Sequence, residues 1–185
     1  MVTYRLTLAA LAMATLSLAS AVTANDSCHP AAAPFPGATC RTVTKPDGTE
    51  TTIYLSGLFT PGSPSESTGR CNADKTIFSG KSTNPEAPLA SDCEALRVWL
   101  DENPGTFAVE PRVGEWMPLA SLDTCGFVAK PVLDNVEVFM ASDDMARLVE
   151  ESLEKRVIDG RLDVLGRTVC EISSVDWRIS GIKSD

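Results

Sequence analysis

The chain has 185 residues with 25 acidic and 16 basic side chains, so its formal net charge is −9 at pH 7. A surface this acidic disfavours nucleic acids and anionic lipid headgroups as partners, because both are bound through clustered Lys and Arg, and it favours neutral or cationic partners. The length suffices for one domain with its own hydrophobic core.

The first 24 residues have the pattern of a secretory signal peptide. Arg5 is followed by an apolar run over residues 6–18 and then by small residues that end at Ala24. We expect cleavage after Ala24, with Ala21 as the alternative, which leaves 161 residues with a charge of −10. The apolar run is short for a membrane span, and no second stretch of ~20 apolar residues follows. The sequence therefore predicts a secreted, extracellular protein with no membrane span.

Six cysteines follow the predicted signal peptide. An even number in the oxidising secretory pathway favours three disulfides. Cys93 could instead be a reactive thiol, because a helix N-terminus lowers the pKa of a thiol. The sole histidine, His29, is poorly placed to serve as its base, so we expect a structural role. The predicted half-cystines are Cys28, Cys40, Cys71, Cys93, Cys125 and Cys170. The simplest partition joins Cys28 to Cys40 and leaves three ways to pair the other four.

Residues 25–60 predict an irregular arm and a β-hairpin. Two runs rich in Thr and Val flank Lys45-Pro46-Asp47-Gly48, which is a typical turn sequence. Residues 61–70 are rich in Pro, Gly and Ser and have the composition of a linker. We expect this linker to separate the N-terminal arm and hairpin from a core domain over residues 71–182.

Two amphipathic helices are predicted in the core. Ser91 or Asp92 is expected to cap the first, which ends at Asn103-Pro104-Gly105. Ser142 is expected to cap the second, which continues towards Gly160. The apolar stripes comprise Cys93, Leu96, Trp99 and Leu100 in the first helix and Met145, Leu148, Val149, Leu153 and Val157 in the second. On the second helix, Glu151 can also pair with Lys155.

The rest of the core has strand patterns. In the last of them, Val175, Trp177 and Ile179 alternate with polar residues. Strands that are interrupted by two helices predict an α+β fold, in which an antiparallel sheet is covered on one face by both helices and pinned by disulfides. The strand order stays open. The predicted strands are residues 75–79, 106–110, 122–130, 135–141, 161–172 and 174–180.

The acidic residues do not predict a catalytic or metal site. A glycosidase needs two carboxyl groups about 5–10 Å apart across a cleft. Capping and an exposed helix face account for Asp143, Asp144, Glu150, Glu151 and Glu154, while Glu115 and Asp123 are too dispersed to pair. A metal site at His29 would lack a second imidazole. We therefore predict no catalytic residue, no cofactor and no metal ligand.

Two residues are candidates for other roles. Trp99 and Trp177 fall on apolar faces, whereas Trp116 lies in a predicted loop and is the candidate for an exposed aromatic that contacts a ligand. Asn25 begins the one sequon with a permitted middle residue, so it is the possible glycosylation site.

Several short motifs are spread across the core. They are Asp92-Cys93-x-x-Leu96, Asn103-Pro104-Gly105-Thr106-Phe107, Thr124-Cys125-Gly126-Phe127, Ser142-Asp143-Asp144, Val175-x-Trp177 and the single residues Gly160, Gly166 and Cys170. With these motifs, residues 71–182 resemble the fungal necrosis-inducing effector domain, the extracellular protein two (Ecp-two homologue) family of plant-pathogen effectors. The resemblance implies a secreted fungal protein that acts in the plant apoplast, is linked to necrosis or virulence, and can be perceived by a plant immune receptor. It supplies no catalytic residues.

The functional hypothesis is a secreted fungal effector that binds an extracellular host or microbial target without catalysis. Two alternatives stay open at this point. One is an antimicrobial or killer-toxin-like protein, and the other is a secreted hydrolase of cell-wall polymers.

Overall fold

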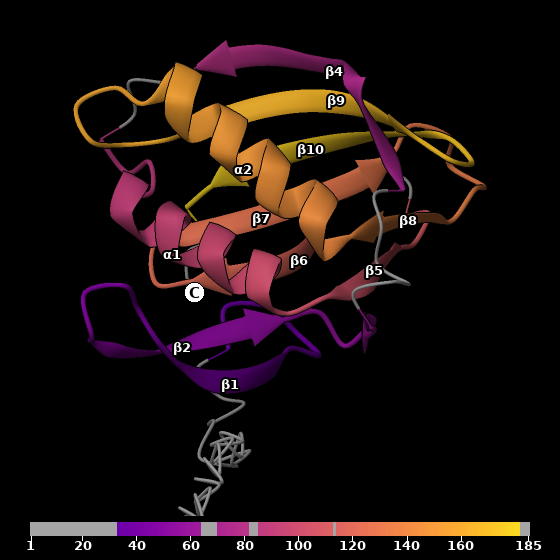
Figure 1. Ribbon diagram of the computed structural model, residues 1–185. Helices are drawn as coiled ribbons and strands as arrows, with labels where there is room; N and C mark the ends of the chain where they lie inside the picture. Colours follow the sequence, from indigo (N-terminus) through magenta and orange to yellow (C-terminus); the bar gives the residue numbers. More distant parts are fainter. Residues whose placement is uncertain (1–32, 64–69, 82–84, 113, 182–185) are drawn as a thin grey trace, which may run out of the picture.

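The computed structural model describes residues 33–63, 70–81, 85–112 and 114–181 (Figure 1). The predicted signal peptide, the Asn25 sequon, Cys28 and His29 lie outside the described residues, so the interpretations placed on them stay predictions. The described residues form two antiparallel sheets and two helices, which confirms the predicted α+β class.

The larger sheet has seven antiparallel strands, and the smaller sheet has three. In spatial order the larger sheet contains β1 (Thr39–Thr44), β2 (Glu50–Leu55), β6 (Met117–Leu122), β7 (Cys125–Pro131), β10 (Ser174–Ser180), β9 (Val164–Cys170) and β4 (Cys71–Lys81). The smaller sheet contains β3 (Phe59–Pro61), β5 (Gly105–Val109) and β8 (Val138–Ala141).

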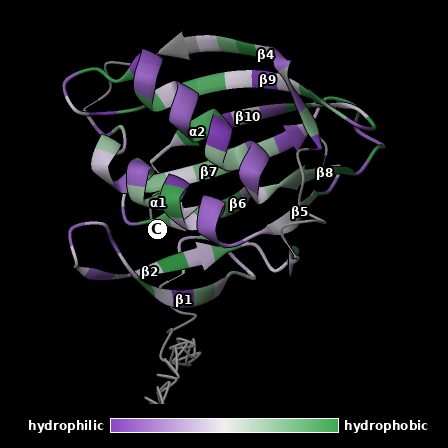
Figure 2. Cartoon of the chain, viewed as in Figure 1, coloured by the Kyte–Doolittle hydropathy of each residue, from purple (hydrophilic) through white to green (hydrophobic). Residues whose placement is uncertain are grey.

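Both helices cross the same face of the larger sheet (Figure 1). They are α1 (Ala90–Glu102) and α2 (Ser142–Arg156), and they pack against each other. Most of α2 is hydrophilic (Figure 2), so only one stripe of it can be buried. Met145, Leu148 and Val149 of the predicted stripe are buried.

Fully buried and partly exposed side chains alternate along β10, so the larger sheet has a covered face and an open face. Val175, Trp177 and Ile179 are fully buried on the helix side, as predicted. The indole of Trp177 packs across Gly166 of the neighbouring strand β9, where a Cβ atom would also come within 2.9 Å of the carbonyl oxygen of Ile77. The residues between the buried ones on β10 point to the opposite face.

The predicted hairpin exists but belongs to the main sheet. β1 and β2 pair across the turn at Lys45-Pro46-Asp47-Gly48, and β2 then pairs with β6. The sequence placed this hairpin in an appendage outside the core, because register between distant strands leaves no local signal. Pro61, which the sequence assigned to the linker, ends β3 and pairs with Gly105 of β5.

The sequence missed two strands, β3 and β6, and drew the strand that corresponds to β7 too long. Residues 122–130 were predicted as a single strand, but β6 ends at Leu122 and β7 begins at Cys125. Between them Asp123 has a φ of +48°, a left-handed conformation that Asp tolerates in tight turns. This turn creates the β6–β7 hairpin at the centre of the sheet.

The predicted helix caps are wrong. α1 begins after Leu89 without a side-chain cap, and α2 begins after Ala141. The hydroxyl of Ser142 instead accepts a hydrogen bond of 3.1 Å from the backbone N–H of Gly105. α2 also stops at Arg156, earlier than predicted, which leaves Val157 38% exposed. The predicted pair of Glu151 and Lys155 is present at 3.1 Å.

Asp92 ties the hairpin to α1 and to the β6–β7 turn. Its carboxylate accepts a hydrogen bond of 3.0 Å from the Lys45 ammonium and one of 2.6 Å from the Thr124 hydroxyl, and Lys45 also pairs with Asp123. Asp92 is only 5% exposed. Burial opposes its ionisation, but the hydrogen bonds from Thr124 and Lys45 outweigh burial and hold the pKa of Asp92 below 3.8.

Asp92→Asn is expected to destabilise the protein at pH 7 by about 1.5–3 kcal/mol, because hydrogen bonds to a charged group are lost. The lowered pKa means that Asp92 contributes its full stability above the unfolded pKa and loses it as the pH falls through the folded value. The difference in the free energy of unfolding between wild type and Asp92→Asn should therefore become smaller in acid. Urea unfolding at pH 7 and at pH 3 measures it. Glu94→Gln, on the exposed side of α1, is the control, and a gap that widens in acid would contradict this assignment.

Candidate binding site

The open face of the larger sheet carries a row of four side chains, three charged and one apolar, that crosses four strands. Lys130 of β7 lies opposite Asp176 of β10, Asp176 opposite Arg167 of β9, and Arg167 opposite Ile77 of β4. Residues directly opposite each other in an antiparallel pair share a face. The row is thus assembled from strands that are distant in sequence.

A hollow of about 340 Å³ lies over this row and opens to solvent. Trp116, in the loop before β6, lies at one side of it, with the Lys130 ammonium 4.9 Å from its ring centroid, which is cation–π distance. Two apolar side chains contribute to the lining: Ile77 is 65% exposed and Leu165 is 38% exposed. The hollow therefore combines an aromatic ring, aliphatic surface and charged groups.

The charges at this hollow are not equally engaged. The Arg167 guanidinium binds both carboxylate oxygens of Asp176, at 2.6 and 3.1 Å, and this hydrogen bonding raises the pKa of Arg167 above its ordinary value. Arg178, two residues along β10, binds both oxygens of Asp163 in the same manner. Within the described part of the chain, Lys130 makes no ion pair with a carboxylate, and its contact is the Trp116 ring.

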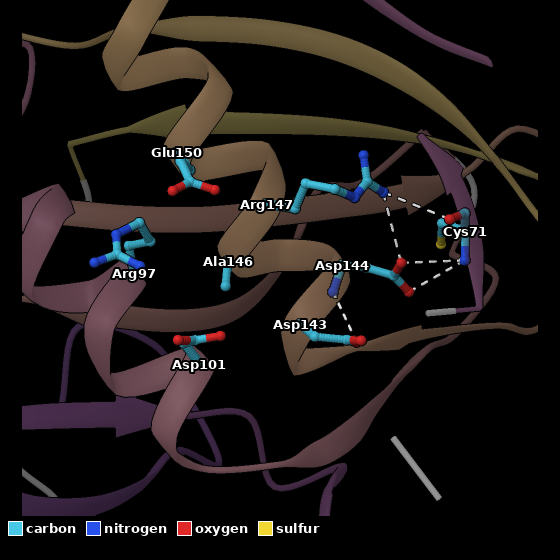
Figure 3. A pocket seen from close by; sticks show the side chains of 8 residues that line it. All are labelled: Cys71, Arg97, Asp101, Asp143, Asp144, Ala146, Arg147 and Glu150. Carbon is cyan, nitrogen blue, oxygen red and sulfur yellow. Dashed lines mark hydrogen bonds and ion pairs between the residues drawn. The ribbon is translucent and has the colours of Figure 1, made fainter. Parts of the chain in front are cut away.

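A second hollow, also of about 340 Å³, lies between α1 and α2 (Figure 3). Arg97 and Asp101 approach it from α1, and Arg147 and Glu150 from α2. Its cations are already engaged by carboxylates, because Arg97 binds Glu94 at 2.8 Å and Arg147 lies 3.6 Å from Asp144. Because charged residues dominate its lining, this hollow has less to offer an organic ligand than the one on the open sheet face.

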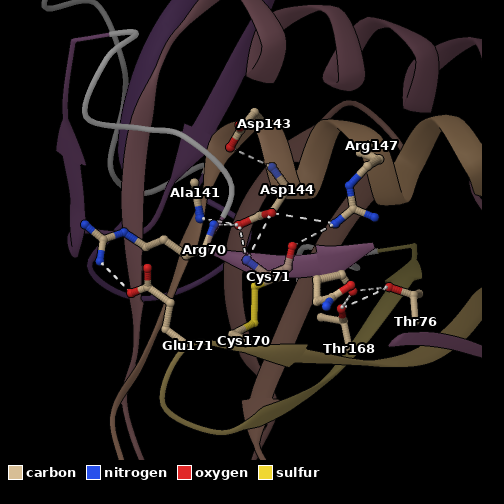
Figure 4. Close-up of a disulfide and its surroundings, with 11 residues drawn as sticks. Arg70, Cys71, Thr76, Ala141, Asp143, Asp144, Arg147, Thr168, Cys170 and Glu171 are labelled. Carbon is tan, nitrogen blue, oxygen red and sulfur yellow. Dashed lines mark hydrogen bonds and ion pairs between the residues drawn. A yellow bond between two sulfur atoms is a disulfide. The ribbon is translucent and has the colours of Figure 1, made fainter. Parts of the chain in front are cut away.

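Asp144 borders the second hollow but is used for structure. It is 2% exposed, and its oxygens accept hydrogen bonds from the backbone N–H groups of Arg70 at 2.8 Å, Cys71 at 3.1 Å and Ala141 at 3.2 Å (Figure 4). Burial raises the pKa of Asp144 above 3.8, against the lowering effect of these hydrogen bonds. A raised carboxyl pKa beside a pocket suits a general acid, but this carboxylate is directed at three backbone donors and is covered from solvent.

The structure selects one pairing for the four core cysteines. Cys71 is bonded to Cys170, its direct partner across β4 and β9 (Figure 4), and Cys93 to Cys125. Cys40 is disulfide-bonded, while Cys28 lies outside the described residues. The helix N-terminal Cys93 is thus a structural half-cystine and not a reactive thiol.

The dispersed acids Glu115 and Asp123 do not form a pair. They flank β6 at its two ends, and six strand residues at ~3.3 Å each separate them by roughly 20 Å, beyond the spacing of a glycosidase pair. Asp123 is engaged with Lys45 and Thr51. Among the described residues no group of three His, Cys, Asp or Glu side chains could hold a metal ion.

Trp116 is the one residue of the open-face hollow that the sequence singled out. Lys130, Arg167 and Asp176 were missed as site residues. In the sequence, these residues are marked only as polar positions of alternating strands. Every exposed strand residue has that property, so it does not single out a site. Trp99 and Trp177, predicted as core residues, are both buried.

Residues 70–170 match the Hce2 family model, described as "Pathogen effector; putative necrosis-inducing factor". The chain belongs to the Hce2 family. This confirms the resemblance drawn from the cysteine motifs, and it places the protein in a family of pathogen effectors. No match was found among curated proteins.

The Hce2 match leaves two parts of the larger sheet outside it. The β1–β2 hairpin precedes residue 70, and β10 follows residue 170. Trp116, Lys130 and Arg167 lie within the match, whereas Asp176 lies beyond it. The structure also has no helix, among the described residues, with the length and apolar character to cross a membrane.

Proposed function

We propose that this Hce2 protein is a secreted fungal effector that acts outside the cell on a host, in the plant apoplast, by binding and not by catalysis. The signal-peptide pattern and the oxidised core cysteines support secretion. Membership of the Hce2 family supports a role in inducing necrosis. The host component could be a plant immune receptor or another extracellular molecule.

One observation supports binding over catalysis. The two best-buried carboxylates, Asp92 and Asp144, are both committed to holding elements of the fold together, through Lys45 and Thr124 in one case and backbone N–H groups in the other. The open sheet face, in contrast, presents an aromatic and aliphatic hollow whose one carboxylate is bound by an arginine. Such a surface is suited to recognition.

Leaf infiltration tests this proposal. Purified, oxidised mature protein is infiltrated into leaves of several plant species, beside a reduced and alkylated sample, and cell death is scored. We expect death in some species with the oxidised sample and none with the alkylated one, because the target would recognise the folded surface. Absence of death in every species, or equal death with the alkylated sample, would contradict a folded effector.

A further inference from the structure

The distribution of charge differs sharply between the two faces of the larger sheet. α1 and α2, on the covered face, carry nine acidic and four basic side chains. β7, β9 and β10 carry three basic side chains, Lys130, Arg167 and Arg178, and a single acid, Asp176. All four of these side chains belong to the open face. Asp163, which directly precedes β9, binds Arg178, so with it three basic side chains meet two acidic ones. A protein that is strongly acidic overall thus turns a weakly basic surface to solvent.

Charge on the far side of the sheet does little to cancel this local surface. The Debye length is about 8 Å at physiological salt, so exposed charges further apart than this are largely screened from one another. A ligand at the open face would therefore respond to Lys130 and its neighbours more than to the helices. The net charge of the chain, which favours neutral or cationic partners, does not apply locally.

The contacts of the hollow specify the chemistry of a ligand. The Trp116 ring and the aliphatic side chains of Ile77 and Leu165 suit a flat ligand with an apolar face. The paired Arg167 and Asp176 offer both donors and acceptors to hydroxyl groups. Lys130 is the cation without a carboxylate partner among the described residues, so it can meet an anionic group of the ligand.

The row of side chains also has the shape for an extended ligand. From Ile77 on β4 through Arg167 and Asp176 to Lys130 on β7, it crosses three inter-strand spacings of ~4.8 Å, or roughly 14 Å in all. The hollow opens to solvent, so a chain molecule could continue beyond it. Trp116 lies at the Lys130 end.

We propose that the open face of the larger sheet binds an acidic oligosaccharide made of uronate units, with a sugar ring against Trp116 and its carboxylate at Lys130. Uronate sugars combine an apolar ring face, several hydroxyl groups and one carboxylate per unit, which are the three features that the hollow matches. The inference deepens the proposed function and rests on it, because it names the class of host molecule that this surface recognises.

Binding of oligogalacturonate to the oxidised mature protein tests the inference directly. Isothermal titration calorimetry should show binding that weakens at least about tenfold when the carboxylates are methyl-esterified, and that weakens with added salt. A neutral chitin oligosaccharide is the second comparison. Equal binding of the acid, the ester and the neutral sugar would overturn the role of Lys130, and no binding of the acid would overturn the inference entirely.

Variants locate the site. Trp116→Ala and Lys130→Ala should each lower the affinity about tenfold or more, and Lys130→Arg should restore most of it. Lys155→Ala removes an exposed lysine of α2 on the opposite face and should leave the affinity unchanged. Thermal unfolding checks that each variant is folded. A loss with Lys155→Ala equal to that with Lys130→Ala would indicate non-specific attraction and contradict the site.

NMR reports where on the protein the ligand binds. The three tryptophans give three indole N–H signals, and Trp116→Phe identifies which belongs to Trp116. Titration with oligogalacturonate should shift that signal and leave those of buried Trp99 and Trp177 in place. Shifts confined to the buried tryptophans would contradict the placement of the ligand.

The two proposals fail separately. If oligogalacturonate does not bind but the oxidised protein still kills leaf cells, the ligand class is wrong and the effector function stands. If oligogalacturonate binds at Trp116 and no plant responds, the binding site stands and the host activity is wrong.

Discussion

Replacing Cys71 and Cys170 together by serine is expected to lower the free energy of unfolding by about 4–5 kcal/mol. This disulfide joins residues 99 apart in sequence, whereas Cys93 and Cys125 are 32 apart. In the chain-entropy account, a bridge restricts the unfolded chain more when it closes a longer loop, by ~4.7 kcal/mol for a loop of about 100 residues and ~3.7 kcal/mol for one of about 30. Guanidinium unfolding of the two double variants measures both losses.

The order of the two losses is the informative result. The Cys71–Cys170 bridge joins β4, at the edge of the larger sheet, to β9, and the backbone N–H of Cys71 also binds Asp144. The Cys93–Cys125 bridge joins α1 to β7 beside the hydrogen bonds between Asp92 and Thr124, which would still hold the two elements together. A larger loss at Cys93–Cys125 would show that local contacts, and not loop length, decide the stability. Each double variant keeps the other core disulfide, which serves as the internal control.

The correct parts of the sequence prediction rest on the local spacing of apolar residues. The buried stripes of α1 and α2 and the alternation of β10 can be read from residues within one or two turns or strand repeats, since neighbouring side chains alone decide which face is apolar. The class of fold followed from the number and spacing of these elements. Strand order could not follow, because the pairing of β2 with β6 or of β4 with β9 depends on contacts between residues far apart in sequence.

The helix caps failed for a related reason. Ser91, Asp92 and Ser142 are typical N-cap residues, and the local sequence offers no reason to use them otherwise. In the structure Asp92 binds Lys45 and Thr124, and Ser142 binds Gly105. These partners are remote in sequence, and each bond stabilises a contact between elements in place of the end of one helix.

The open-face hollow shows the same limit at the level of the site. Trp116 stood out from the sequence because a tryptophan in a loop needs an explanation. Lys130, Arg167 and Asp176 are unremarkable in their own strands and become a row only through the order β7-β10-β9. The net charge was misleading for the same reason, since it averages an acidic helix face with a weakly basic sheet face.

Asp144→Ala is expected to lower the free energy of unfolding by about 3 kcal/mol or more. The substitution removes the acceptor of three backbone N–H groups, those of Arg70, Cys71 and Ala141. Each buried N–H left without a partner costs about 1–3 kcal/mol. Asp143→Ala is the matched control, because Asp143 is the half-buried acid next to it in the first turn of α2, and its carboxylate accepts a local hydrogen bond of 2.9 Å from the N–H of Asp144. Urea unfolding should show a loss of about 1 kcal/mol or less for the control.

Asp144→Asn separates the charge of this residue from its hydrogen bonds. Because burial raises the folded pKa above the ordinary 3.8, ionisation of Asp144 opposes folding, and its contribution to stability is complete below the unfolded pKa and is lost as the pH rises through the folded value. Wild type should therefore gain stability relative to Asp144→Asn as the pH falls towards 3.8. This is the opposite sign to Asp92→Asn, whose gap to wild type narrows in acid. Unfolding of both variants over one pH series decides the assignment, and gaps that move in the same direction would contradict it. Opposed signs would mean that acid relieves the cost of burying the charge of Asp144 while it removes the ion pair between Asp92 and Lys45.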